Sequence, residues 1–471
     1  MKRYFAIIAV AVAALFLPGC IGSGGSSAPA PNNVQVVAKD SRAILTWDMV
    51  SGVEYWIFHA NGTGVSPKNC SSMLLCYTTV NVTSPASATG LTNDLPYTFS
   101  INGRRSGGPG GPGSVAVSAQ PRLAGKKWTP PLTNPIPNTT AMRGVAYGVT
   151  SAAVATFVAA GDSGALYSGT VYTTPNPDPT IVVDTGITWT PLNPLPATTF
   201  NAVSYDPFGT LYLVAGNGGA ILQSTDAVTW TPQTSGTTKT GNALYAIANN
   251  GASTIVAAGA AYTIIYSLDH GVSWALAVPP TVSGSPALNG VAYGYVTSLG
   301  VSRFLAVGAS GTVLYSVDGW NWFAATSLPS PISSSEVKGV TYGLVGGYGT
   351  FVVVTADGYS TMTLDGGTTW TTPVQVSTSA LNAVAASVNP AVPLSTTVTA
   401  VPYITTVTNA FVAVDSAGKI WRYDSLDGAG VTWGWEPVAV YPGSTPLYAV
   451  TRGGLYDYAA VGASGTNLYA D

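Results

Sequence analysis

The sequence predicts an all-β chain, and its composition is the first observation that indicates this. The 471 residues include 54 Gly and 33 Pro, whereas Asp, Glu, Lys and Arg together make up only 8%. This balance suits short strands joined by tight turns rather than long charged helices. The second observation is a unit of four short strands that returns seven times after about residue 126. Such repetition predicts a seven-bladed β-propeller, preceded by a smaller domain of alternating strands.

The N-terminus predicts export. Lys2 and Arg3 precede an apolar run from Tyr4 to Leu17. The run is shorter than the roughly 20 residues of a membrane-spanning helix and is typical of a secretory leader.

The leader ends in a short motif with a cysteine. Leu17-Pro18-Gly19-Cys20 resembles the lipobox of bacterial lipoproteins. The resemblance implies that residues 1–19 are removed and that Cys20 is acylated, which anchors the chain to a membrane. Pro18 is unusual in that motif, and a plain signal peptide cut nearby is the alternative. Ile21 stands where the sorting rule of enteric bacteria would place Asp for the inner membrane, so the resemblance implies the outer membrane.

Two cysteines remain after Cys20. Cys70 and Cys76 can close a small loop as a disulfide in an oxidising compartment, and two free thiols are the alternative. A metal site is disfavoured because the only histidines, His59 and His270, stand apart from the cysteines. No cofactor is expected.

Residues 20–32 are rich in Gly, Ser and Pro and predict a flexible tether. Residues 33–122 then alternate in short strands. This segment resembles a fibronectin type III domain, through Trp47, Tyr55 and the pair Leu91 and Tyr97. The resemblance implies a two-sheet sandwich whose corner is tied by the leucine and the tyrosine. Such a domain next to an anchor is expected to be a spacer, with a binding site as the alternative.

Residues 126–471 contain the seven units of the predicted propeller. Their first strands run from "RGVAYG" at 143–148 to "LYAVTR" at 447–452. The seventh unit lacks a fourth strand, and the orphan strand "KKWTPPL" at 126–132 is expected to supply it. Closing the ring in this way removes exposed sheet edges.

A motif between the third and fourth strands recurs with variations. In "SLDHGVSW" it reads Ser-x-Asp-x-Gly-x-x-Trp and resembles the Asp box of sialidase-like and sortilin-like propellers. Ser and Asp can hydrogen-bond the turn, Gly supplies a positive φ, and Trp covers the edge between blades. We interpret the boxes as structural, with a peripheral carbohydrate or cation site as the alternative. Their residues are Ser267, Asp269, Gly271 and Trp274, then Ser224, Asp226, Trp230, Ser316, Asp318, Trp322, Asp365, Trp370, Asp427 and Trp433.

Catalysis is disfavoured by the residues available. Sialidases need three convergent arginines, which the scattered arginines of residues 126–471 do not readily provide. Glycoside hydrolysis needs two carboxylates that flank the sugar, and turn chemistry is the alternative role for those that could serve. These candidates are Asp162, Asp206, Asp357 and Asp415.

Two further features are candidate contacts. Tyrosines recur at one position of the first strands, where they could stack sugars or pack between blades; they are Tyr147, Tyr205, Tyr293 and Tyr342. Insertions at 169–183 and 387–409 are longer than a turn requires and are preferred positions for a partner to bind. Poorly ordered loops without a binding role are the alternative.

These features together predict a function. The repeats "VGASGTVLYSVDGWNWF" and "DGGTTWT" resemble those of the photosystem II assembly-factor family, a non-enzymatic propeller that binds proteins. We therefore expect a lipid-anchored envelope protein that is not an enzyme, whose propeller binds an envelope protein as a scaffold or adhesin. A surface protein that binds or cleaves a polysaccharide is the alternative. Nucleic acid is not expected, since no stripe of Lys or Arg is present.

Overall fold

The structure is a computed structural model that describes most of the chain after the leader. The described residues are 25–39, 42–62, 64–73, 76–93, 95–121, 125–126, 128–131, 136–174, 184–192, 197–233, 241–281, 284–345, 348–386, 411–425, 433–438, 444–453 and 457–470. Their regular structure consists of strands and short 3-10 turns. No helix in this part of the chain has the length and apolar character needed to cross a membrane. The leader, Cys20, Asp427 and residues 387–409 lie outside the described residues.

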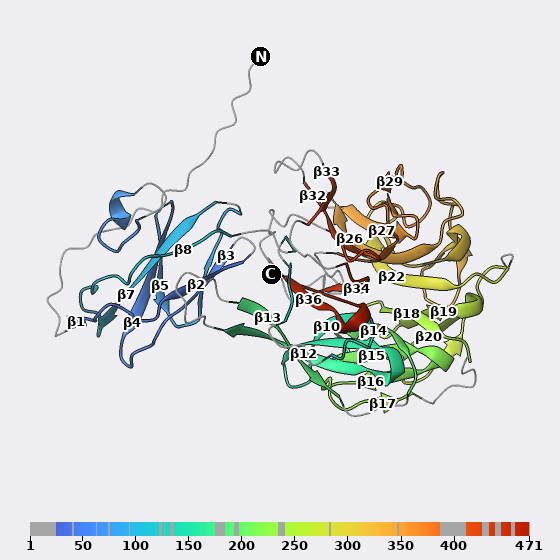
Figure 1. The fold of residues 1–471 in the computed structure, drawn as a ribbon, viewed down its shortest axis with the longest axis horizontal. Coiled ribbons are helices and arrows are strands. Elements are labelled where there is room, and N and C mark those ends of the chain that lie inside the picture. Colours follow the sequence, from blue (N-terminus) through green and yellow to red (C-terminus); the bar gives the residue numbers. More distant parts are fainter. Residues whose placement is uncertain are drawn as a thin grey trace, which may run out of the picture. The chain divides into compact units, whose positions relative to one another are not determined.

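The chain folds into two compact units. The first is built mainly from residues up to Gln120, and the second mainly from Pro121 onwards. In Figure 1 the first unit carries the blue strands and the second carries the strands coloured from green to red.

Residues 26–119, most of which belong to the first unit, contain antiparallel strands in two sheets. One sheet has the order β1-β7-β4-β5, with β8 also paired to β7, and the other has the order β2-β3-β6. Trp47 meets Tyr55 edge to face at 5.5 Å between ring centroids, and Leu91 and Tyr97 are both buried. The strands are β1 (Ser26–Ser27), β2 (Gln35–Lys39), β3 (Arg42–Thr46), β4 (Glu54–Asn61), β5 (Tyr77–Val82), β6 (Ala86–Thr89), β7 (Tyr97–Arg105) and β8 (Val117–Ala119).

The second unit is a β-propeller. Its described residues form seven four-stranded antiparallel sheets, called blades 1 to 7 here. The first strand of each blade lies beside the first strand of the next, and the last of them lies beside the first of blade 1, so the inner strands form a ring.

Each blade takes its strands in chain order, except that blade 7 borrows its fourth. Blade 1 has β10 (Met142–Val149), β11 (Ala155–Gly161), β12 (Leu166–Thr174) and β13 (Asp184–Pro191); blade 2 has β14 (Phe200–Asp206), β15 (Leu211–Gly216), β16 (Ile221–Ser224) and β17 (Thr231–Pro232); blade 3 has β18 (Leu244–Asn249), β19 (Ile255–Gly259), β20 (Ile264–Ser267) and β21 (Ala275–Leu276). Blade 4 has β22 (Leu288–Val296), β23 (Val301–Gly308), β24 (Val313–Ser316) and β25 (Phe323–Ala324); blade 5 has β26 (Val337–Val345), β27 (Tyr348–Thr355), β28 (Tyr359–Thr363) and β29 (Val374–Gln375). Blade 6 has β30 (Leu381–Ala386), β31 (Phe411–Asp415), β32 (Ile420–Ser425) and β33 (Trp433–Pro437); blade 7 has β34 (Leu447–Arg452), β35 (Tyr458–Gly462), β36 (Asn467–Ala470) and β9 (Trp128–Thr129).

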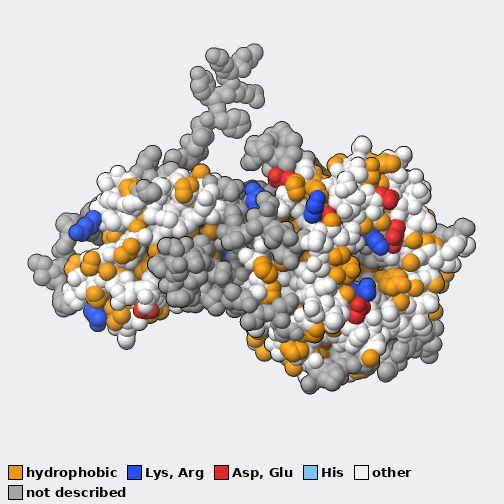
Figure 2. Space-filling model, viewed as in Figure 1, with side chains coloured by type: hydrophobic (Ala, Val, Ile, Leu, Met, Phe, Trp, Pro, Cys, Tyr) orange, Lys and Arg blue, Asp and Glu red, His pale blue; other side chains and the backbone are white. Residues whose placement is uncertain are grey.

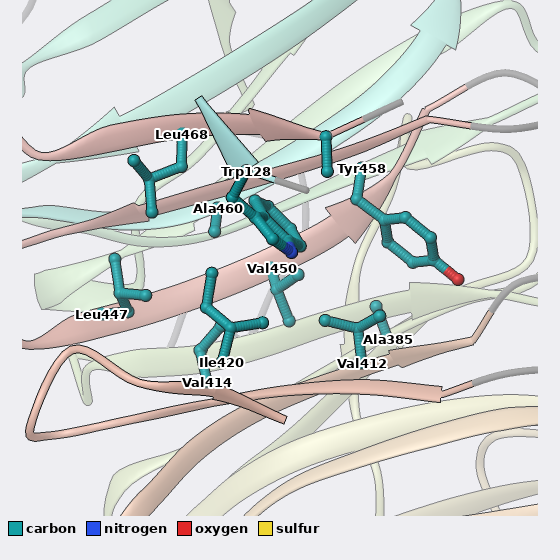
Figure 3. Packing of buried hydrophobic residues seen from close by; sticks show 11 residues of the cluster. Trp128, Ala385, Val412, Val414, Ile420, Leu447, Val450, Tyr458, Ala460 and Leu468 are labelled. Atoms are coloured by element: carbon teal, nitrogen blue, oxygen red, sulfur yellow. The ribbon is translucent and has the colours of Figure 1, made fainter. Parts of the chain in front are cut away.

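The orphan strand closes the ring. Ala470 of β36 pairs with Trp128 of β9, so the fourth strand of blade 7 comes from the start of the propeller. Trp128 is buried in an apolar cluster that includes Ile420 of blade 6 and Leu468 of blade 7 (Figure 3). The closing strand therefore brings its own hydrophobic anchor.

A second contact joins blade 7 to blade 1. The Gly465 N–H donates to the Thr140 carbonyl at 2.7 Å, and the Trp189 indole N–H donates to Asn467 Oδ1 at 3.0 Å. The seam of the ring is thus held by strand pairing, apolar packing and side-chain hydrogen bonds together.

The propeller has two faces, which we name by what they carry. The start face carries the starts of the inner strands and the turns between second and third strands. The Asp162 N–H of such a turn donates to the Ala141 carbonyl just before β10. The box face carries the turns between first and second strands and those between third and fourth strands. There the His270 N–H of one turn donates to the Ser253 carbonyl of the other.

Candidate functional site

The Asp boxes are closed, self-contained turns. In blade 3, Asp269 Oδ1 accepts hydrogen bonds from the Ser267 hydroxyl at 2.7 Å and the Ser273 N–H at 2.9 Å. The Gly271 N–H donates to Ser267 Oγ, and the Trp274 indole donates to the Gly271 carbonyl at 2.9 Å. Gly271 has φ +84°, which suits glycine. Every polar group of the motif has a role within the turn.

The other described boxes repeat this geometry with small changes. Asp226, Asp318 and Asp365 each accept the hydroxyl of the box Ser or Thr and two backbone N–H groups. The Trp322 indole donates within its own turn, whereas the Trp370 indole donates to Thr326 of the preceding blade.

These hydrogen bonds stabilise the ionised form of the box carboxylates. Partial burial raises the pKa of Asp226, but N–H groups of Thr229 and Val228 and the Ser224 hydroxyl lower it to about 2. The pKa values of Asp269, Asp318 and Asp365 are lowered in the same way against the same opposing burial. The box face therefore carries fixed negative charges at neutral pH.

Two of the candidate catalytic carboxylates are fully buried. Asp415 accepts hydrogen bonds from Ser377 Oγ at 2.8 Å, the Lys419 N–H at 2.7 Å and the Trp421 indole at 3.0 Å. Asp206 accepts the Phe208 N–H at 3.1 Å, and its Oδ2 lies 2.8 Å from His270 Nδ1. Both have 0% exposure, so neither presents a carboxylate to a substrate.

The other two candidates lie on the start face in different blades. Asp162 of blade 1 forms an ion pair with Arg143 at 2.6 Å, and Asp357 of blade 5 accepts the Ser335 hydroxyl. Each carboxylate accepts a hydrogen bond from a side chain of its own blade. These partners give all four candidates a structural role.

Asp206 and His270 link neighbouring blades. Asp206 ends β14 of blade 2, and His270 stands in the box turn of blade 3, with 40% of its side chain exposed. Sequence reasoning overlooked His270 as a contact because its partner lies 64 residues away in the chain.

The recurrent tyrosines pack between blades. The Tyr205 hydroxyl donates to the Val149 carbonyl of the preceding blade at 2.7 Å, and a Cβ on Gly148 would overlap the Tyr205 ring. Tyr342 has the same relation to Gly294 of the preceding blade. Tyr147 and Tyr293 pack on phenylalanines of their own blades at 5.0 and 4.7 Å between ring centroids. The glycine in one inner strand thus makes room for the tyrosine of the next.

The remaining predicted residues are placed only in part. Cys70 and Cys76 form a disulfide in the first unit. Cys20 and Asp427 lie outside the described residues, as do the side chain of Trp433, most of the 169–183 insertion and the insertion at 387–409. Within the described part of the chain, no group of three or more metal-ligating side chains occurs.

The box face of blades 1 to 5 carries exposed apolar side chains, which we call the tip surface. They stand in its turns or on the strand residues beside them, with exposures between 37% and 60%. Figure 2 shows hydrophobic side chains dispersed over the visible side of the second unit, among few charged ones. The tip surface consists of Val149, Val154, Phe208, Val228, Leu268, Val272, Tyr295, Leu299, Val301, Val317, Trp320, Tyr348 and Leu364.

Hydrogen bonds between blades join turns of the box face. The Ser151 N–H of blade 1 donates to the Thr225 carbonyl in the box turn of blade 2. The Ser298 hydroxyl of blade 4 donates to the Leu364 carbonyl in the box turn of blade 5 at 3.1 Å. Arg303 of β23 donates to the Asp365 carbonyl at 3.2 Å. Turns of neighbouring blades are therefore in direct contact on this face.

The start face has a repeated irregularity, which we call the bulge ring. In all seven described inner strands the pairing register skips the second residue. Such a β-bulge leaves a residue outside the ladder and redirects its side chain. The next residue is always Gly or Ala, which lets neighbouring inner strands approach closely. The bulge ring consists of Arg143, Asn201, Tyr245, Asn289, Lys338, Asn382 and Tyr448.

Both surfaces escaped the sequence analysis for the same reason. The bulge residues differ in type from repeat to repeat, and the residues of the tip surface stand at variable positions of the boxes and of the turns between first and second strands. Alignment of the repeats marks these positions as variable, and a polar residue before each Gly or Ala of the first strands was the available signal.

Comparisons with known proteins add a likeness of fold alone. No protein-family model and no curated protein matches the chain. Among solved structures, YCF48 from Cyanidioschyzon merolae has a TM-score of 0.48 and 16% identity over 73% of this chain and 98% of that one. YCF48 bound to D1 peptide has a TM-score of 0.48 and 14% identity, covering 73% and 94%. The WD40 β-propeller domain of Doa1 has a TM-score of 0.48 and 11% identity, covering 73% and 97%.

Proposed function

We propose that this is a lipid-anchored envelope protein whose seven-bladed propeller is a non-catalytic platform for a protein partner. A fibronectin type III spacer and the tether at 20–32 would hold the platform at a distance from an outer membrane, with acylated Cys20 as the anchor. The observation that carries the binding role is the tip surface.

The tip surface has the character of a contact site. Phe208 is 60% exposed and Tyr348 is 58% exposed, and five neighbouring blades contribute. We infer a contact role because these exposed apolar side chains all belong to one face of the propeller. Because interblade hydrogen bonds hold the turns in place, a partner would meet a preformed surface.

The charges on this face favour a protein over a lipid surface. Asp226, Asp269 and Asp318 have lowered pKa values and remain ionised among the apolar side chains. Burying ionised carboxylates in hydrocarbon is costly. The described turns of this face in blades 1 to 5 hold no Lys or Arg, and the Arg303 guanidinium beside them donates to the carbonyls of Asp365 and Gly366. A protein partner can offer Lys or Arg beside its own apolar surface.

The engaged carboxylates support a role without catalysis. A glycosidase needs one carboxyl group that donates a proton and a second that acts as base or nucleophile. Asp206 and Asp415 are buried, and Asp162 is held by Arg143.

Cross-linking tests the platform. The full chain, cross-linked in its own envelope and analysed by mass spectrometry, should link one recurrent protein to residues beside the tip surface. Phe208→Ser and Trp320→Ser should reduce this product at least roughly tenfold, as expected for loss of aromatic anchors. Val374→Ser is the matched control, since Val374 is 53% exposed on outer strand β29. An equal loss of the cross-linked product in the control would contradict the proposal. Cross-links only to lipid or to a second copy of the chain would also contradict it.

The anchor has a separate test. The wild-type chain should incorporate labelled palmitate and fractionate with membranes, and Cys20→Ala should do neither. A Cys20→Ala chain that still carries the label would show that the lipid is attached elsewhere.

A further inference from the structure

The residue at the bulge position can be compared among the seven blades. The same backbone irregularity occurs in seven blades, so any residue type that the bulge itself required would be expected in every blade. What differs between blades is therefore open to another use.

Asparagine at this position has a structural role. Asn201 Nδ2 donates to the Leu244 carbonyl of the next inner strand at 2.9 Å. Asn382 Nδ2 makes the same bond to Leu447 at 2.7 Å, and Asn289 Nδ2 makes it to Val337 at 3.0 Å. These hydrogen bonds join blade 2 to blade 3, blade 4 to blade 5, and blade 6 to blade 7.

The other four bulge residues make no such bond in the described structure. Arg143 pairs instead with Asp162 at 2.6 Å, and Lys338 pairs with Glu336 at 3.0 Å. Tyr245 is 36% exposed. The Arg143 guanidinium lies over the Tyr448 ring at 5.9 Å from its centroid. The contact between Arg143 and Tyr448 joins blade 1 to blade 7, and the four side chains place two cations and two aromatic rings at one face.

The ion pairs at this face present both signs of charge to solvent. The side chains of Arg143 and Asp162 are 43% and 33% exposed, and those of Lys338 and Glu336 are 32% and 42% exposed. A ligand with a net charge would be attracted by one member of each pair and repelled by the other. Hydroxyl groups suit both members, because a hydroxyl donates to a carboxylate and accepts from a cation.

The aromatic residues complete this chemistry. The faces of Tyr rings pack on apolar C–H surfaces while their hydroxyls hydrogen-bond. A sugar ring offers an apolar C–H face and a rim of hydroxyls. We propose that the start face binds an uncharged, hydroxyl-rich glycan through Arg143, Tyr245, Lys338 and Tyr448, together with the carboxylates of Asp162 and Glu336. Since a cation holds each of these carboxylates, the glycan is bound and released intact.

The repeats themselves suggest the test variants. Tyr245→Asn and Arg143→Asn install the residue that the fold already uses in blades 2, 4 and 6, so both chains should fold. The full chain is screened on an array of neutral and acidic oligosaccharides, and the strongest neutral binder is then titrated by calorimetry. Each variant should bind this oligosaccharide at least roughly tenfold more weakly, with an unchanged or higher Tm. Tyr348→Asn is the matched control, because Tyr348 is an exposed tyrosine of the box face.

Three results would overturn the inference. They are an array on which no neutral oligosaccharide binds, binding confined to acidic glycans, and equal losses in Tyr245→Asn and Tyr348→Asn. Because this site and the tip surface lie on opposite faces, the two proposals fail independently. A Phe208→Ser chain that loses its protein partner should keep the glycan.

Discussion

The two faces of the propeller are built from the same repeats yet differ in what they vary. On the box face, hydrogen bonds inside each turn hold the Ser and Asp side chains in place. The residues between them, such as Leu268 and Val317, are exposed and apolar. On the start face, the bulge is constant and the bulged side chain changes from Asn to Arg, Lys or Tyr. In both cases the repeated part holds the fold, and the variable part faces solvent.

The seam should give the largest effect, because both faces depend on a closed ring. Trp128→Ala removes a 2% exposed indole from the cluster shared by blades 6 and 7. We expect a loss of about 3–5 kcal/mol in the free energy of unfolding, measured by urea denaturation. Val374→Ala on an outer strand should cost far less. A Trp128→Ala chain as stable as that control would mean that β9 does not hold the ring.

The box aspartate should give the second effect. Asp269→Ala deletes the acceptor of hydrogen bonds from Ser267 and Ser273. Hydrogen bonds to a charged acceptor at a partly exposed turn suggest a loss of about 2 kcal/mol. Leu268→Ala in the same turn should change stability little. Equal effects of the two substitutions in thermal unfolding would contradict a structural role for the box.

Acid should weaken the box face selectively. The folded pKa of Asp226 is about 2, below its ordinary value of 3.8. A depressed pKa stabilises the fold above the ordinary value, and this contribution is lost as pH falls from about 4 towards 2. The carboxylate is exposed, so the effect should stay below about 1 kcal/mol. Urea unfolding across this pH range should show a shallower pH dependence for Asp226→Asn than for wild type, and identical slopes would refute the assignment.

Tyr245→Asn should have the smallest effect on stability. It places Asn where three sister blades already use it, so the free energy of unfolding should change by no more than about 0.5 kcal/mol. Calorimetric unfolding provides the check, and a gain would fit a new hydrogen bond to the next blade. A loss as large as that of Asp269→Ala would show that the start face cannot tolerate this exchange.

The sequence predicted the repeated features and missed those that depend on contacts between repeats. Periodic small-residue strands and box turns indicated an all-β propeller, and the orphan Trp128 strand indicated the partner of β36, with which it pairs. The packing of Tyr205 against Gly148 was left open because the two residues belong to neighbouring blades.

The candidate sites were harder to predict for a related reason. In the sequence Asp206 ends a first strand and Asp415 stands in a hairpin turn, and only tertiary structure shows that both are buried. The tip surface arises where turns more than 60 residues apart meet, as Ser298 and Leu364 do. The bulge ring has no residue pattern, because Arg, Asn, Lys and Tyr share a position but little chemistry.

Partner cross-linking in Phe208→Ser and Tyr245→Asn, measured side by side in the envelope, tests most directly whether the faces have separate roles. Phe208→Ser should lose the cross-linked partner, and Tyr245→Asn should keep it at the wild-type level. Loss of the partner in both variants, or in Tyr245→Asn alone, would contradict the assignment of protein binding to the tip surface.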